Sequence, residues 1–200
     1  MLLDSGNDAG ANASFSFMKH CLPIRKIKFN PYDSSDEALP FMVLGPDSPF
    51  SYRQAVGLLA EDFANSTGFS PAPYEPKEGD HYGKAYLRDR LLVFSKLVGE
   101  GKICFCGAVG MRWKRYEFTD MPEAEGWFMT WAWFHPNERR KGYLSNAWPY
   151  ILKLFPDFMP QPPATMAMGS FLKKMKFNHP YLLHGEFPTV TPLPSSIPCG

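Results

Sequence analysis

Three consecutive cations stand directly before a glycine in the segment HPNERRKGYL, residues 135–144. Arg139, Arg140 and Lys141 precede Gly142, and an apolar helical pattern begins immediately after it. The first N–H groups of a helix lack partners within the helix, and the helix dipole adds positive potential there. A phosphate can bind at such a helix start, while Arg side chains neutralise its remaining charge. The segment therefore predicts an anion site, although the same charges would also suit an exposed turn.

Carboxylates that could act as a general base lie in a second segment, EFTDMPEAEG, which spans residues 117–126. We predict that this segment is a loop leading into the strand WFMTWAWF. Glu117, Glu123 and Glu125 are candidates to act as a general base or to attract a cationic substrate. Glu125 is favoured because it stands one residue from Gly126, where the strand starts. Each of the three also fits a solvated loop carboxylate.

Two further kinds of side chain in this region have both a chemical and a structural interpretation. The ordinary pKa of His135 suits proton transfer near neutral pH, but its position after the strand and before Pro136 indicates a structural role. The alternation of Trp127, Trp131 and Trp133 predicts three indoles on one face of a strand. Core packing is the interpretation we favour, and a lining for an apolar substrate pocket is the alternative.

The four cysteines, Cys21, Cys104, Cys106 and Cys199, show no zinc-site spacing. Cys104 and Cys106 are two residues apart in the predicted strand KICFCGAVGMRW, so both would face the same side. We interpret them as small apolar core residues. The sequence therefore predicts neither a metal site nor a disulfide.

Composition limits the classes of function. A chain of 200 residues with 44% hydrophobic residues can bury the core of one domain. A net charge of +1 argues against a nucleic-acid partner or an anionic membrane surface. No apolar run approaches the roughly 18 residues of a membrane helix, and the N-terminus lacks the features of a signal peptide. These observations predict a cytoplasmic protein and leave a homodimer open.

The chain divides into a flexible leader at 1–17, one domain at 18–186 and a proline-rich tail at 187–200. Neither a P-loop nor a dinucleotide-binding motif is present. Hydrophobic periodicity predicts a mixed α/β domain. The predicted elements are a short strand at 24–29, a helix at 51–64 with a capping box of Ser51 and Gln54, a strand or helix end at 91–98, strands at 102–113 and 127–134, and helices at 144–155 and 168–177.

The order of strand, basic loop and helix resembles the acetyl-CoA-binding core of the GNAT N-acetyltransferase superfamily. The loop of that family reads Arg/Gln-x-x-Gly-x-Gly/Ala, and the matching segment here is RRKGYL at 139–144, preceded by FHP at 134–136. GKICFCGAVGMRW is similar to the third strand of the family, and PATMAMGSFLKKMKF to its following strand and helix. The resemblance covers roughly residues 51–183. It departs from the family at Leu144, where a small residue is usual, and at Leu172, where many members have a Tyr general acid.

The resemblance implies an α/β fold with a mixed, mostly antiparallel central sheet flanked by helices, and a splayed strand pair that holds acetyl-CoA. It implies an N-acetyltransferase in which an amine attacks the thioester directly. The alternatives are a catalytically silent acyl-CoA sensor and a protein-interaction module that uses the proline-rich tail. The cofactor-binding residues implied by the resemblance are Trp131, Ala132, Trp133, Phe134, Arg139, Arg140, Lys141, Gly142, Tyr143 and Leu144.

Overall fold

The computed structural model describes residues 21–23, 40–69, 72–76, 89–98, 102–118, 121–161 and 165–177. For residues 21–23, 98, 102, 115–118 and 121–124 the description covers the backbone alone. The predicted leader, the predicted tail and the predicted strand at 24–29 lie outside the described residues.

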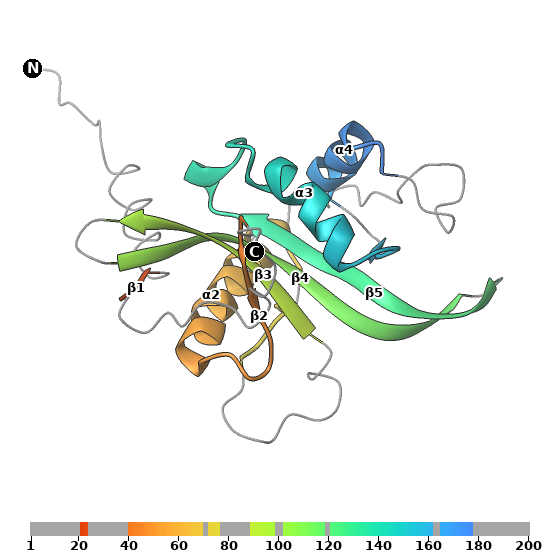
Figure 1. Cartoon of the computed structure of the whole chain (residues 1–200), viewed down its shortest axis with the longest axis horizontal. Coiled ribbons are helices and arrows are strands. Elements are labelled where there is room, and N and C mark those ends of the chain that lie inside the picture. Colours follow the sequence, from red (N-terminus) through yellow and green to blue (C-terminus); the bar gives the residue numbers. More distant parts are fainter. Residues whose placement is uncertain are drawn as a thin grey trace, which may run out of the picture.

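The described residues form a six-stranded sheet in which the path of neighbouring strands is β2-β3-β4-β5-β6, and β1 pairs with β4 (Figure 1). All neighbours are antiparallel except β5 and β6, which are parallel. The prediction of an α/β fold with a mostly antiparallel sheet is therefore confirmed. The strands are β1 at Cys21–Pro23, β2 at Met42–Leu44, β3 at Asp89–Val98, β4 at Lys102–Phe118, β5 at Met121–Phe134 and β6 at Met159–Pro160.

Helices cover both faces of this sheet (Figure 1). α2 (Phe50–Thr67) packs on one face, and α3 (Tyr143–Leu154) and α4 (Met166–Lys174) pack on the other. A short 3-10 turn, η3 (Pro136–Glu138), joins β5 to the basic loop. Within the described residues, no helix combines the length and the apolar character needed to cross a lipid bilayer.

The predicted helix at 51–64 is confirmed as α2, but its predicted capping box is wrong. The N-cap residue is Pro49, and no side chain makes a capping hydrogen bond. The helix begins at Phe50, so Ser51 already has a helical backbone. Its hydroxyl is therefore past the N-cap position from which it could accept a bond from an N–H in the first turn.

The segment at 117–126 is not the loop that its acidic composition suggested. β4 continues to Phe118 and β5 begins at Met121, so the segment forms the end of a long hairpin. The register between the two strands runs through the pair of Arg115 and Glu125. Pairing of one strand with another is not revealed by the composition of a single segment.

A bulge in β5 overturns the predicted alignment of three indoles. Gly110 pairs with Trp131 and Met111 pairs with Met129, so Thr130 is an extra residue with no partner on β4. A bulge shifts the alternation of side chains by one residue. Trp127 accordingly packs in the cluster beneath α3 and α4, whereas Trp131 and Trp133 pack in the cluster beneath α2.

Cys104 and Cys106 are both buried, as predicted for core residues, but the prediction of no disulfide is wrong for Cys104. Cys104 is disulfide-bonded, and Cys21 of β1 stands opposite it in the strand register. Cys106 is a free thiol that donates to the carbonyl oxygen of Phe94 at 3.3 Å. The separation of 83 residues between Cys21 and Cys104 gives no spacing pattern from which their pairing could be predicted.

Candidate functional site

Gly142 marks a break between the basic loop and α3. It is the N-cap of the helix and adopts the left-handed conformation with a φ of 83°. The N–H of Asn146 donates to the Gly142 carbonyl at 2.9 Å. Within the described residues, the N–H groups of residues 140–145 donate no hydrogen bond in a turn or a helix cap. These donors at the start of α3 can therefore bind a ligand.

The backbone of the loop makes a concave arrangement of donors. Arg140 also has a positive φ, 62°, although it carries a side chain. A left-handed residue other than glycine costs about 1–2 kcal/mol and is retained where the surrounding structure requires it. Successive N–H groups in such turns can point to the same side and form a nest for an anion. The loop combines this geometry with the N-terminus of a helix.

A cavity of about 530 Å³ opens beside these donors. Its walls come from the end of α2, the end of β5, the basic loop and the start of α4. The lining includes every predicted cofactor-binding residue except Trp131. The residues around it are Phe63, Ser66, Thr67, Ala132, Trp133, Phe134, Glu138, Arg139, Arg140, Lys141, Gly142, Tyr143, Leu144, Ser145, Thr165, Ala167, Met168 and Phe171.

No strand among the described residues pairs with the end of β5 on the edge that borders this cavity. In the described part of the chain, β6 pairs with β5 only at Phe128 and Met129, and the N–H of Gln161 donates to the Met129 carbonyl at 2.9 Å. Backbone groups alternate in direction along a strand, and the bulge adds one step to that alternation. The groups of Ala132 and Phe134 therefore point to the same edge as those of Met129, beyond the last pair with β6.

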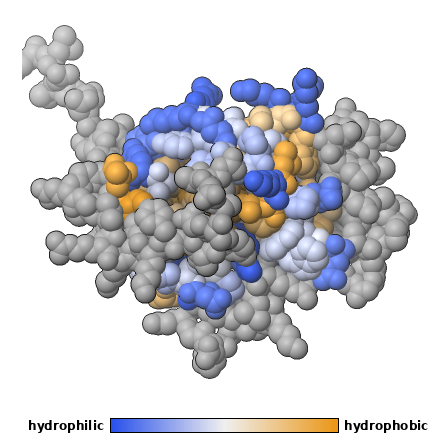
Figure 2. Space-filling model, in the orientation of Figure 1, coloured by the Kyte–Doolittle hydropathy of each residue, from blue (hydrophilic) through white to orange (hydrophobic). Residues whose placement is uncertain are grey.

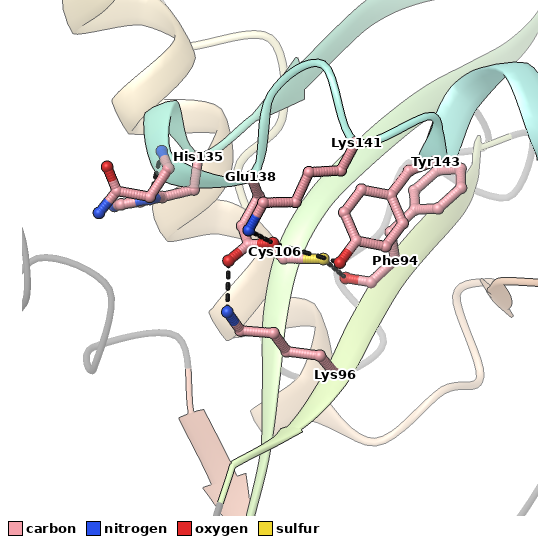
Figure 3. A network of polar contacts seen from close by, with 8 residues as sticks. Phe94, Lys96, Cys106, His135, Glu138, Lys141 and Tyr143 are labelled. Atoms are coloured by element: carbon pink, nitrogen blue, oxygen red, sulfur yellow. Dashed lines mark hydrogen bonds and ion pairs between the residues drawn. The ribbon is translucent and has the colours of Figure 1, made fainter.

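A buried carboxylate lies beneath the loop (Figure 3). The side chain of Glu138 is only 3% exposed and accepts from Lys96 of β3, from Lys141 at 3.0 Å and from the Tyr143 hydroxyl at 3.2 Å. Burial alone would raise the pKa of Glu138, but the hydrogen bonds from Lys96, Lys141 and Tyr143 outweigh it, so the pKa is lowered. Glu138 is therefore a carboxylate that ties β3, the loop and α3 together.

The three cations of the loop have different partners. Arg139 donates from Nε to the Phe134 carbonyl at 2.9 Å, and its guanidinium lies 5.7 Å from the centre of the Trp133 ring. Lys141 is paired with Glu138. The exposed Arg140 has no hydrogen bond or ion pair within the described part of the chain. Arg140 is thus the cation whose charge is available to a ligand in the cavity.

Glu125 does not line this cavity. Its exposed carboxylate accepts from Trp113 Nε1 at 2.8 Å. It stands seven positions before Ala132, which corresponds to about 23 Å along an uninterrupted strand. The side chains of Glu117 and Glu123 lie outside the described residues, and their catalytic role stays a prediction.

His135 and Tyr143 both lie close to the loop. His135 is 3% exposed, its Nδ1 accepts from the Asn137 N–H at 3.3 Å, and it is absent from the cavity lining. Burial lowers the pKa of His135 and so disfavours the charged ring. Burial raises the pKa of Tyr143 to about 12, so its hydroxyl is a neutral donor to Glu138.

Sequence reasoning missed Glu138 and the contribution of α2. Within ERRK, Glu138 had the appearance of a solvated charge, and only its proximity to three cations hinted at a paired carboxylate. Ser66 at the end of α2 accepts from Trp133 Nε1 at 3.1 Å and so joins α2 to the end of β5. No motif in the sequence indicates this contact between positions 67 residues apart.

No protein-family model matches the chain, and no curated protein matches it. Among solved structures, the chain is similar to a mutant of the BH1408 protein from Bacillus halodurans, with a TM-score of 0.43 and 9% identity. A tetramutant of BH1408 gives a TM-score of 0.40 and 10% identity. Both similarities cover 69% of this chain and 92% of the other chain. A similarity of this size assigns neither a family nor a function.

Proposed function

We propose that this chain binds acetyl-CoA and transfers its acetyl group to an amine, on a GNAT-like fold. The observation that carries the proposal is the joint position of two sets of backbone groups. The donors around Gly142 and the free edge of β5 at Ala132 and Phe134 border the same cavity of about 530 Å³. One ligand with an anionic end and an amide-bearing arm would use both sets.

The diphosphate of the cofactor suits the loop. The N–H groups of residues 140–144 and the dipole of α3 favour an anion at this point. The Arg140 side chain adds a positive charge, since Arg139 and Lys141 are engaged elsewhere. Leu144 lines the cavity but does not fill it.

The pantetheine arm of the cofactor suits the strand edge. Its amides can pair with free backbone groups as an added strand would, which is a common way to bind an extended ligand. Ala132 offers both its N–H and its C=O in this direction. At Phe134 the carbonyl already accepts from Arg139 Nε. Arg139 thereby fixes the junction between the edge and the loop.

Acetyl-CoA supplies an acyl thioester that an amine can attack without a covalent enzyme intermediate. The C–N bond forms, the C–S bond breaks, and the departing sulfur accepts a proton. In this proposal a backbone N–H at the edge of β5 donates to the thioester oxygen. Cys106 is not needed as a nucleophile: burial raises its pKa to about 11, so it stays protonated near neutral pH. The proton of the attacking amine passes to a general base, for which Glu117, Glu123 and Glu125 stay predictions, although their backbone lies towards the far end of the hairpin from this cavity.

Binding is tested by following the melting temperature of the full chain with acetyl-CoA. At about 100 times its Kd a ligand adds roughly 2.7 kcal/mol to the free energy of unfolding. Gly142→Asp should abolish this effect, because it places a side chain and a negative charge beside the phosphates. Gly68→Asp is the matched control: Gly68 also has a positive φ, 75°, at the end of α2, and a Cβ there meets nothing within 4 Å.

Stabilisation in the control and its loss in Gly142→Asp would support the site. Equal stabilisation of both variants would place the cofactor elsewhere, and no stabilisation of the parent would favour an interaction module. Transfer is then tested by release of the free CoA thiol in the presence of a panel of amines. Binding without release with any amine would assign a silent acyl-CoA-binding protein.

A further inference from the structure

A second, smaller cavity continues from the first. It has a volume of about 50 Å³ and shares Phe63, Ala132, Thr165 and Met168 with the larger cavity. We call it the small chamber. It lies where β5 and β6 separate, because Met129 and Pro160, the last pair between these strands, both line it. Its complete lining is Phe63, Phe69, Met129, Thr130, Trp131, Ala132, Pro160, Gln161, Thr165 and Met168.

The walls of the small chamber are mainly aromatic and aliphatic. The ring of Phe63 lies 5.4 Å from that of Phe69 and 6.0 Å from that of Trp131, measured between centroids. Met129 and Trp131 are 3% and 4% exposed. The apolar character continues to the surface at the start of α4, where Met166 is 64% exposed. In Figure 2 apolar residues, in orange, show at the surface over α3 and α4.

The polar side chains in the lining already have partners. Thr130 Oγ1 donates to the Gly110 carbonyl at 3.1 Å, and Gln161 Oε1 accepts from Lys114 at 2.9 Å. Thr165 Oγ1 accepts from the Met168 N–H at 3.2 Å. None of the described residues lining the small chamber is charged. Burial of a polar or charged group there would be unfavourable, whereas burial of a hydrocarbon would not.

We infer that the small chamber receives the acyl group, with its hydrocarbon part against the apolar walls, and selects acyl-CoA thioesters with short chains, acetyl and propionyl above all. This inference rests on the proposed function, since the thioester would enter from the larger cavity. A cavity needs about 10–15 Å³ of this volume for each water molecule, which is close in size to one non-hydrogen atom of a ligand. The 50 Å³ of the small chamber therefore hold roughly four non-hydrogen atoms. A propionyl group has that size.

The amine acceptor is a less suitable occupant. An amine carries a charge or N–H groups that need several acceptors, whereas the described lining holds no charged side chain and only three polar ones, each already in a hydrogen bond. The acyl chain has neither requirement. The four shared residues also make the small chamber a direct continuation of the cavity that would hold the thioester.

The inference is tested by measuring the Kd of the full chain for CoA, acetyl-CoA, propionyl-CoA and octanoyl-CoA by isothermal titration calorimetry. One additional buried methylene should make propionyl-CoA bind about fourfold more tightly than acetyl-CoA. An octanoyl chain overfills the small chamber and should bind roughly tenfold more weakly than propionyl-CoA. Binding of these compounds is measured without any acceptor or turnover.

Phe69→Ala opens one wall of the small chamber at a side chain that is 39% exposed, so the fold should be retained. It should remove the preference for propionyl-CoA and relieve the penalty on octanoyl-CoA. Leu152→Ala is the control, because Leu152 is also 39% exposed and lines neither cavity. Equal affinity of the parent for CoA and all three thioesters would overturn the inference and leave the proposed function intact. Failure of every CoA compound to bind would overturn both.

Discussion

The carboxylate of Glu138 offers a quantitative test of how the loop is held. Glu138→Gln preserves the shape of the side chain and removes its charge. One oxygen, Oε2, accepts from both Lys141 and Tyr143, and the other accepts from Lys96. An amide NH2 in place of Oε2 would face the Lys141 ammonium, which is also a donor. The variant therefore loses both ion pairs, with Lys96 and Lys141, and at least one of the hydrogen bonds.

The exposure of the two lysines limits how much the free energy of unfolding falls in Glu138→Gln. Hydrogen bonds to charged groups contribute about 1.5–3 kcal/mol each, and removal of one partner from a fully buried ion pair costs about 3–5 kcal/mol. Here Lys96 and Lys141 are 36% and 50% exposed, so both can turn towards water. We expect the free energy of unfolding to fall by about 2 kcal/mol, near the lower limit of these ranges. For a chain of this length the melting temperature should fall by about 4–8 °C.

The assay is unfolding in urea, with the stability difference taken from the midpoint at constant m value. Glu125→Gln is the matched control: this carboxylate also accepts a hydrogen bond, from Trp113, but is exposed, so a change within about 0.5 kcal/mol is expected. If Glu138→Gln were as stable as Glu125→Gln, the buried carboxylate would not hold the loop, and the structural role assigned to Glu138 would be refuted.

The same variant predicts a pH dependence with a definite sign. The pKa of folded Glu138 lies below its ordinary value of 4.5, so its stabilising effect is complete above that pH. The effect is lost as the pH falls through the lowered pKa of the folded state. The stability difference between the parent and Glu138→Gln should therefore be constant near neutral pH and shrink below about pH 4.5. A difference that grew on acidification would contradict this assignment.

Three further predictions test other parts of the site. Gly110→Ala should destabilise the fold by about 1–3 kcal/mol, because its Cβ would overlap the indole nitrogen of Trp131. Gly126→Ala is the control, because a Cβ there meets nothing within 4 Å and should not destabilise the fold. The stability of both variants is measured by thermal unfolding. Arg140→Ala should raise the Kd for acetyl-CoA, and should reduce the dependence of that Kd on salt, more than Arg139→Ala does, since Arg139 is engaged with a backbone carbonyl. Iodoacetamide should leave Cys106 unmodified in the native chain and label it after denaturation, because Cys106 is buried and burial raises its pKa to about 11. Labelling is measured by mass spectrometry, and labelling of Cys106 in the native chain would contradict this prediction.

The local features of the fold could be predicted from the sequence. Apolar periodicity located α2, α3 and α4, because each helix buries one stripe against the sheet. The β-branched and aromatic content located the strand that became β5. The position of Gly142 before an apolar helix predicted the loop as a candidate anion site. Each of these signals lies within about a dozen residues, the range over which helix and strand patterns act.

The features that could not be predicted depend on contacts between distant segments. The burial of Glu138 requires Lys96, which is 42 residues away in the sequence. The position of Ser66 near Trp133 requires α2 to cross the end of β5. The disulfide of Cys104 depends on the pairing of β4 with a strand near the N-terminus. The acidic composition around Glu117 and Glu123 predicted a loop, but both residues lie on the paired strands β4 and β5.

The bulge at Thr130 links the local pattern of β5 to the contacts between distant segments. It decides which residues of β5 present their backbone groups at the edge beside the cavity. With an uninterrupted alternation, the edge that Met129 presents to β6 would continue at Trp131 and Trp133. The extra residue moves that edge to Ala132 and Phe134 and places both indoles beneath α2. The candidate site thus depends on one unpaired residue in the register, which no short motif in the sequence identifies.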